Sequence, residues 1–153
     1  MKKILVLLLL VVLASCNKKD VVFTETEKNF PDNRWALNDT KIFNISIKED
    51  VQDAGVYLHF SHVFEPQYKE VPVAAVLQDP GGKQEHVLLN LKLEDARGNS
   101  LSDCTGDICE FIIPVKEHLN LVKGEYKLVI LNKFNREYIP NVLALGVSIE
   151  KKN

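Results

Sequence analysis

The strongest constraint on the fold is an alternation of apolar and polar residues with a period of two, which recurs in seven short segments. Successive side chains of a β-strand point to opposite faces of a sheet, so this period gathers the apolar side chains of each segment on one face. Such segments are typical of antiparallel sheets with one buried and one wetted face. They lie at residues 43–47, 56–60, 71–77, 87–93, 111–115, 126–130 and 143–149.

The stretches between these segments carry turn-forming residues, and no long segment with the helical period of 3.6 competes with them. About seven short strands in a chain of this length predict an all-β fold, an antiparallel β-sandwich with an immunoglobulin-like strand order. One helical turn is expected at residues 116–121. Tyr126, after Leu121 and Gly124, has the spacing of a tyrosine corner, and a half-buried strand tyrosine is the alternative.

The N-terminus predicts export and lipid attachment. Lys2 and Lys3 precede ten apolar residues, 4–13, which are too few for a membrane-spanning helix. The run ends at Leu13-Ala14-Ser15-Cys16, the pattern of a bacterial lipobox, in which the cysteine thiol receives a diacylglycerol before cleavage. We therefore expect a removed signal peptide at 1–15, a lipidated Cys16 with a flexible tether at 16–29, and one domain at 30–153.

The two remaining cysteines, Cys104 and Cys109, form an even pair in an exported and oxidising compartment. The residues between them include Gly106 and Asp107, which favour a turn that brings the thiols together. A disulfide between Cys104 and Cys109 is therefore predicted.

The charge balance excludes one class of partner. Of the 19 basic residues, Lys2 and Lys3 leave with the signal peptide, so 17 basic residues face 21 acidic ones. A chain with this balance and no basic stripe is a poor binder of nucleic acid, and we expect no nucleic-acid partner.

The sequence shows no set of residues typical of an enzyme. It has no Gly-x-Ser-x-Gly elbow that would present a nucleophile. His59 and His62 are three apart on a predicted strand, so they should point to opposite faces, and both are interpreted as sheet-surface residues. The acidic loop around Asp103 and Asp107 does not match the 12-residue calcium loop. We expect no catalytic residue, no metal site and no cofactor.

Two connecting segments carry aromatic and charged residues and are the candidate interaction surface. Residues 132–141 form a connection longer than a hairpin requires. The alternative is that Phe134 and Tyr138 fold back and cap the sandwich. The candidate residues are Phe64, Tyr68, Lys133, Phe134, Arg136 and Tyr138.

Five stretches in this order resemble the gliding-motility lipoprotein (GldH) family of Bacteroidetes-type bacteria, and the resemblance covers nearly the whole mature chain. Besides the lipobox they are 29–35 (NFPDNRW), 58–63 (LHFSHV), 103–109 (DCTGDIC) and 132–143, with NKF and YIPNVL at its two ends.

The resemblance implies a non-enzymatic envelope lipoprotein, facing the periplasm from the inner or the outer membrane. It further implies a scaffold or assembly role in gliding motility linked to type IX secretion, with other gliding or secretion envelope proteins as partners. The alternative from another class is a lipid-anchored carbohydrate- or peptide-binding sandwich that uses Tyr57, Tyr68 and loop aromatics as stacking platforms.

Overall fold

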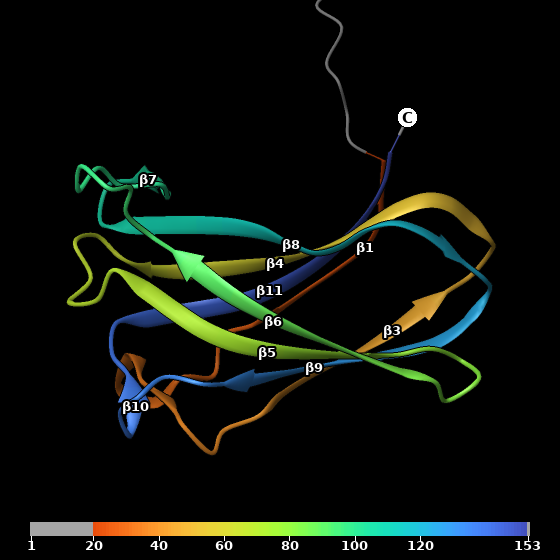
Figure 1. Cartoon of the computed structure of the whole chain (residues 1–153), viewed down its shortest axis with the longest axis horizontal. Helices are drawn as coiled ribbons and strands as arrows, with labels where there is room; N and C mark the ends of the chain where they lie inside the picture. The colour runs from red at the N-terminus through yellow and green to blue at the C-terminus, as the bar shows by residue number, and fades with distance from the viewer. Residues whose placement is uncertain (1–19, 153) are drawn as a thin grey trace, which may run out of the picture.

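Two layers of antiparallel strands make up the chain in the computed structural model, which describes residues 20–152 (Figure 1). The predicted signal peptide and Cys16 lie outside the described residues. One layer is a five-stranded sheet and the other a four-stranded sheet. The predicted all-β sandwich is confirmed.

The five-stranded sheet has the strand order β1-β11-β4-β8-β7. Its strands are β1 (Asp20–Glu27), β11 (Val142–Lys151), β4 (Val51–Val63), β8 (Ile108–Leu121) and β7 (Asp103–Thr105). The four-stranded sheet has the order β3-β9-β5-β6. Its strands are β3 (Lys41–Ile47), β9 (Gly124–Asn132), β5 (Glu70–Gln78) and β6 (Gln84–Lys92). Two short strands, β2 (Trp35–Ala36) and β10 (Tyr138–Ile139), pair separately, and a 3-10 turn, η1, spans Pro31–Asn33.

The strand order is that of a jelly roll and not of an immunoglobulin domain. Among the eight long strands, the first, eighth, third and sixth form one sheet, and the second, seventh, fourth and fifth form the other. In the immunoglobulin order the first two strands are neighbours in one sheet, whereas β1 and β3 lie in different sheets here. The predicted immunoglobulin-like order is therefore wrong, because alternation locates strands but does not determine which strands pair.

The prediction of a flexible tether at 16–29 is wrong for residues 20–27. Asp20–Glu27 forms β1, which pairs with β11 from Asp20 opposite Lys151 to Glu27 opposite Leu145. Most side chains of β1 are exposed, so the strand has no buried stripe that would show as alternation. Its backbone hydrogen bonds to a strand more than a hundred residues away hold it in place.

The predicted helical turn at 116–121 is also wrong, because β8 continues as a strand to Leu121. Its pairing with β4 shifts register between Val51 and Ala54, between Ala54 and Val56 and again before Tyr57. Such bulges add residues to one strand without ending the ladder, and they disturb the simple period of two.

The predicted tyrosine corner is present. The Tyr126 hydroxyl donates a hydrogen bond to the Val122 carbonyl at 3.2 Å and accepts one from the Val122 N–H at 3.0 Å. Both bonds tie the start of β9 to the end of β8, so the corner fixes the connection between the two sheets.

The topology gives the sandwich two distinct ends. Each long strand runs opposite to the one before it, so successive connections lie at alternate ends. We call the end where β1 begins at Asp20 the anchor end; it holds the short connections 48–50, 79–83 and 122–123. The distal end holds the long connections 28–40, 64–69, 93–102 and 133–141, with β7 and β10, on the left of Figure 1.

Candidate functional site

The four long connections of the distal end contact one another. The Leu93 N–H donates to the Lys69 carbonyl at 2.8 Å, which joins 93–102 to 64–69. The rings of Tyr68 and Phe134 join 64–69 to 133–141. β10, within 133–141, pairs with β2, within 28–40. The loops therefore form one connected surface on the end of the sandwich.

A cavity of about 440 Å³ opens in this surface between the 64–69 loop, the 93–102 loop and the β4–β8 pair. Its size falls within the range of small-molecule sites, and its walls mix apolar and carboxylate side chains. It is lined by His62, Phe64, Glu65, Pro66, Leu93, Glu94, Gly98, Ser100 and Cys109.

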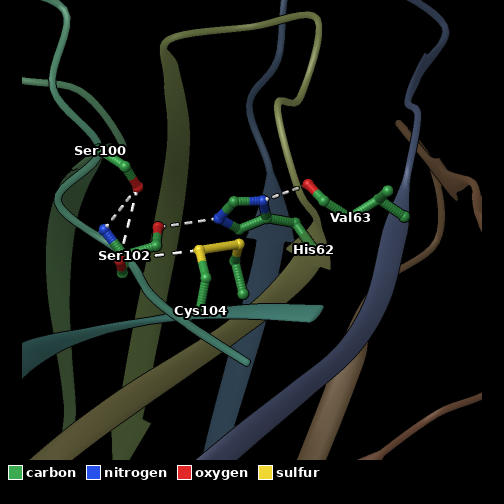
Figure 2. The surroundings of a disulfide bond; sticks show 6 residues. His62, Val63, Ser100, Ser102 and Cys104 are labelled. Atoms are coloured by element: carbon green, nitrogen blue, oxygen red, sulfur yellow. Dashed lines mark hydrogen bonds between the residues drawn. A yellow bond between two sulfur atoms is a disulfide. The ribbon is translucent and has the colours of Figure 1, made fainter. Parts of the chain in front are cut away.

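His62 forms a polar part of the cavity wall and is 1% exposed, so its interpretation as a sheet-surface residue is wrong. Its Nδ1 donates to the Val63 carbonyl at 2.8 Å, which leaves Nε2 to accept from the Ser102 hydroxyl at 2.8 Å (Figure 2). Burial lowers the pKa of His62, because a charged imidazolium would lose its hydration there. The imidazole is thus held neutral in one tautomer.

The predicted disulfide between Cys104 and Cys109 is present. The two cysteines are directly opposite each other in the β7–β8 hairpin, and Cys109 is also the cross-strand neighbour of His62 in the β4–β8 ladder. The disulfide lies beside the imidazole in Figure 2. It fixes the hairpin that supports one wall of the cavity.

Phe64 is the most exposed of the four predicted aromatic contact residues. Its side chain is 47% exposed on the cavity rim. The next residue, Glu65, has a φ of 52°, a left-handed conformation that costs free energy in a residue other than glycine. The backbone bond from Phe64 to Asp107 holds the loop in this shape.

Tyr68 and Phe134 fold back on the sandwich, as the capping alternative describes for Phe134. Their rings meet edge to face, with centroids 5.8 Å apart. Tyr68 is 7% exposed, and among the described residues its buried hydroxyl has no hydrogen-bond partner. Burial raises the pKa of this hydroxyl. Tyr68 therefore packs against the sandwich and supports the 64–69 loop, so its ring is not available as a stacking platform for a ligand.

The other three predicted contact residues lie on the 133–141 connection. Lys133 and Arg136 are exposed, and the Lys133 N–H donates to the Pro72 carbonyl at 3.1 Å. Tyr138 is half-buried, and the Arg34 guanidinium lies 4.6 Å from the centroid of its ring. The structure brings all six predicted residues to the distal end, but it separates Phe64 at the cavity from Tyr138 at the β2–β10 pair.

A second polar cluster, on the outer face of the five-stranded sheet, was missed by sequence reasoning. His59 Nε2 lies 2.8 Å from the Ser148 hydroxyl, and His59 Nδ1 lies 3.3 Å from Glu110 Oε1. Ser148 is 4% exposed, and β11 is paired on both sides, by β1 and by β4. A nucleophilic serine needs nearby free backbone N–H groups to bind an oxyanion, and pairing on both sides of β11 occupies these groups. The contacts among His59, Ser148 and Glu110 therefore link the three strands β4, β11 and β8.

Two further findings concern residues 20–152. No helix among them has the length and hydropathy to cross a membrane. They also contain no group of three or more histidine, cysteine, aspartate or glutamate side chains placed to hold a metal ion.

The family model for the GldH lipoprotein matches residues 22–149. This chain belongs to the GldH lipoprotein family. GldH family membership makes it a gliding-motility-associated lipoprotein, anchored in the cell envelope by lipid. The matched range starts inside β1 and ends inside β11, so the family pattern spans the whole sandwich. A search of curated proteins gave no significant match.

Two of the solved structures that resemble this GldH family member share low sequence identity and low TM-scores with it. A viral particle of infectious bursal disease virus is 15% identical, with a TM-score of 0.38, over 99% of this chain and 35% of the viral chain. A CocE/NonD family hydrolase from Staphylococcus aureus is 8% identical, with a TM-score of 0.38, over 86% of this chain and 31% of the hydrolase. The chain spans about a third of the length of these proteins.

Proposed function

We propose that the protein is a non-enzymatic scaffold or assembly component of the gliding machinery linked to type IX secretion. In this proposal lipid on Cys16 holds it at a membrane and the sandwich faces the periplasm. The observation that carries the proposal is that β1, which follows Cys16 in the sequence, begins at the end of the sandwich opposite the connected loop surface.

The anchor side of this arrangement is short. Cys16 is four residues before Asp20, where β1 begins. Four extended residues span at most about 14 Å, so lipid on Cys16 would keep the anchor end close to the bilayer surface. Such a short tether would leave the domain little freedom to move away from the membrane.

The distal side reaches outward. β4 has 13 residues and runs from one end of the sandwich to the other, which corresponds to about 40 Å at the rise of a β-strand. The cavity rim, with the exposed Phe64, would thus lie tens of ångströms from the anchor. Exposed aromatic side chains on a preformed surface favour protein contacts, which supports a role in holding partners at a set height.

Cell-based crosslinking through the distal end tests the proposal. A photo-crosslinking amino acid in place of Phe64, in intact cells of a gliding bacterium, should yield adducts with envelope proteins of motility or secretion. The same substitution at Lys48, in an anchor-end turn, is the matched control. Adducts that are absent at Phe64, or that are the same at both positions, would contradict the proposal.

The anchor requires its own test. A variant in which residues 1–16 are exchanged for a signal peptide that is cleaved without lipidation should give a folded sandwich released from the membrane, and it should not support colony spreading in place of the native protein. Ser15→Ala keeps a small residue beside the cysteine and should leave both membrane attachment and spreading intact. Full spreading by the soluble, unlipidated form would overturn the proposed role of membrane attachment.

A second candidate function is binding of a carbohydrate or peptide fragment in the distal cavity. The cavity volume and the exposed Phe64 favour it, whereas the burial of Tyr68 removes one of the expected stacking platforms. Titration with soluble peptidoglycan fragments by calorimetry tests this candidate. Binding that is lost in Phe64→Ala and kept in Lys48→Ala would favour a binding module over a scaffold.

A further inference from the structure

Strand β6 forms one edge of the four-stranded sheet, and one of its two sides is unpaired in the described part of the chain. β6 pairs with β5 along its whole length, from Gln84 opposite Gln78 to Lys92 opposite Glu70. Within residues 20–152, no strand pairs with its other side. A strand edge of nine residues with one side unpaired is a template for another extended chain.

The backbone groups on this free side can be assigned. The Leu93 N–H donates to Lys69 and the Asp79 N–H donates to the Lys83 carbonyl, so odd-numbered residues of β6 face β5 in the hydrogen-bonded pairs. In an antiparallel ladder bonded and non-bonded pairs alternate. The N–H and carbonyl groups of His86, Leu88 and Asn90 therefore point to the open side.

The side chains beside this edge are apolar and incompletely covered. Leu88, on the outer face, is 83% exposed, the largest value among the exposed large apolar side chains of residues 20–152. On the inner face, Val87 and Leu89 are only partly buried against the core. Phe111 and Ile113, on the neighbouring β8 of the other sheet, are also only partly buried. The sandwich is thus incompletely closed on the side of β6 and β8.

The opposite side of the same sheet is closed. Phe43, Ile45 and Ile47 of its other edge strand, β3, are at most 1% exposed, and β1 packs beside β3 there. The open side therefore belongs to β6, and it does not result from a uniformly loose sandwich.

Two free edges of the five-stranded sheet carry features that oppose pairing. β8 has Pro114 and a bulged register beyond the β7 hairpin, and the exposed edge strand β1 has a register shift between Val21 and Phe23. The middle of β6, residues 87–91, has no proline, no charge and no register shift. β6 therefore lacks these protective features on the side where the sandwich is incompletely closed.

We propose that β6 is a docking edge that receives an extended segment of a different envelope protein as an added strand. The added strand would bond to the free backbone groups of His86, Leu88 and Asn90. Its inward side chains would cover Val87 and Leu89 and its outward ones would pack beside Leu88, so the segment should be uncharged and apolar at alternate positions.

The short tether argues against a second copy as the occupant. Two copies joined antiparallel through β6 are related by a two-fold axis that reverses the strand direction. Their anchor ends would then point in opposite directions, separated by about the 31 Å length of a nine-residue strand. With both sandwiches upright on one membrane, a four-residue tether of at most about 14 Å cannot bridge that distance.

Photo-crosslinking in intact cells, with full-length lipidated protein, tests the proposal. The photo-crosslinking amino acid is placed at His86 or at Asn90, and at Asn44 on β3 as a matched exposed position of the same sheet face. We expect adducts from both β6 positions and none from Asn44. Mass spectrometry should locate the two attachment points four residues apart in one segment of one other protein, as strand pairing requires.

Two variants separate backbone pairing from side-chain contact. Leu88→Pro removes an N–H on the free side without removing a bond to β5, and should abolish the adducts. Leu88→Thr keeps the N–H and should retain them, while melting curves show that both variants fold. The proposal would be overturned if the β6 positions gave no adducts, if Asn44 gave adducts as well, or if the adducts joined β6 to a second copy. An equal loss of adducts in Leu88→Pro and Leu88→Thr would also overturn it. A failure here leaves the distal crosslinks from Phe64 unaffected, so the two proposals can fail separately.

Discussion

The buried side chain of Asn132 donates a hydrogen bond from Nδ2 to the backbone carbonyl of Trp35 at 2.9 Å. Its Oδ1 accepts a second bond from the Phe134 N–H at 2.8 Å. One amide therefore satisfies backbone groups of two distal loops that are distant in sequence. The shape of the distal surface depends on this side chain as well as on the β2–β10 pair.

Replacement of this amide should loosen the distal end. Asn132→Ala leaves the Trp35 carbonyl and the Phe134 N–H without their partner, which should lower the free energy of unfolding by about 2–3 kcal/mol. Chemical denaturation measures the loss. Asn135→Ala, at an exposed position of the same loop, is the control and should change stability little; equal effects of the two variants would contradict the role given to Asn132.

The lowered pKa of His62 predicts acid sensitivity. The unfolded chain binds a proton at the ordinary histidine pKa of about 6.5, whereas the folded chain binds it at a lower pH. The unfolded state therefore holds more protons just below pH 6.5, and the free energy of unfolding should fall as the pH falls through that range.

Melting temperatures between pH 7.5 and pH 5 measure this effect. His62→Gln should reduce the slope of stability against pH, although it lowers stability at neutral pH. A slope that is the same in wild type and His62→Gln would show that other groups control the acid response.

The disulfide should contribute modestly to global stability and more strongly to the order of the β7–β8 hairpin. A double variant, Cys104→Ala with Cys109→Ala, should lose about 2 kcal/mol, because the closed loop is short. Hydrogen exchange should speed up first in β7. A reducing agent should destabilise the wild type and leave the double variant unchanged, and free thiols in the oxidised wild type would refute the pairing.

The tyrosine corner gives a test at the opposite end. Tyr126→Phe removes both bonds between the hydroxyl and Val122, which should cost about 1–2 kcal/mol. Tyr138→Phe is the control, because the ring of Tyr138 contacts Arg34 and should keep that contact without its hydroxyl. Thermal melting that ranks the two variants in the reverse order would contradict this assignment.

Sequence reasoning located what depends on local chemistry. The period of two identified the buried strands, the Cys104–Cys109 spacing identified the disulfide, and the Leu121, Gly124 and Tyr126 spacing identified the corner. These features are encoded within a few residues, so a single sequence carries them.

It failed where structure depends on distant partners. β1 is held by β11 and has no buried stripe of its own, so it was assigned to the tether. The burial of His62 depends on Ser102 and on the loop that carries it, and the burial of Tyr68 depends on Phe134. The jelly-roll order depends on pairings across the whole chain. None of these relations leaves a local pattern.

The pairing of β1 with β11 determines how the protein would carry mechanical load. Tension between lipid on Cys16 and a partner at the distal end would pull β1 along its own length toward the anchor end. The inter-strand hydrogen bonds of an antiparallel ladder lie across the strands, so the bonds from Asp20 to Glu27 would be strained together in shear and not broken one after another. The first strand of the sandwich would thus serve as a force-bearing clamp.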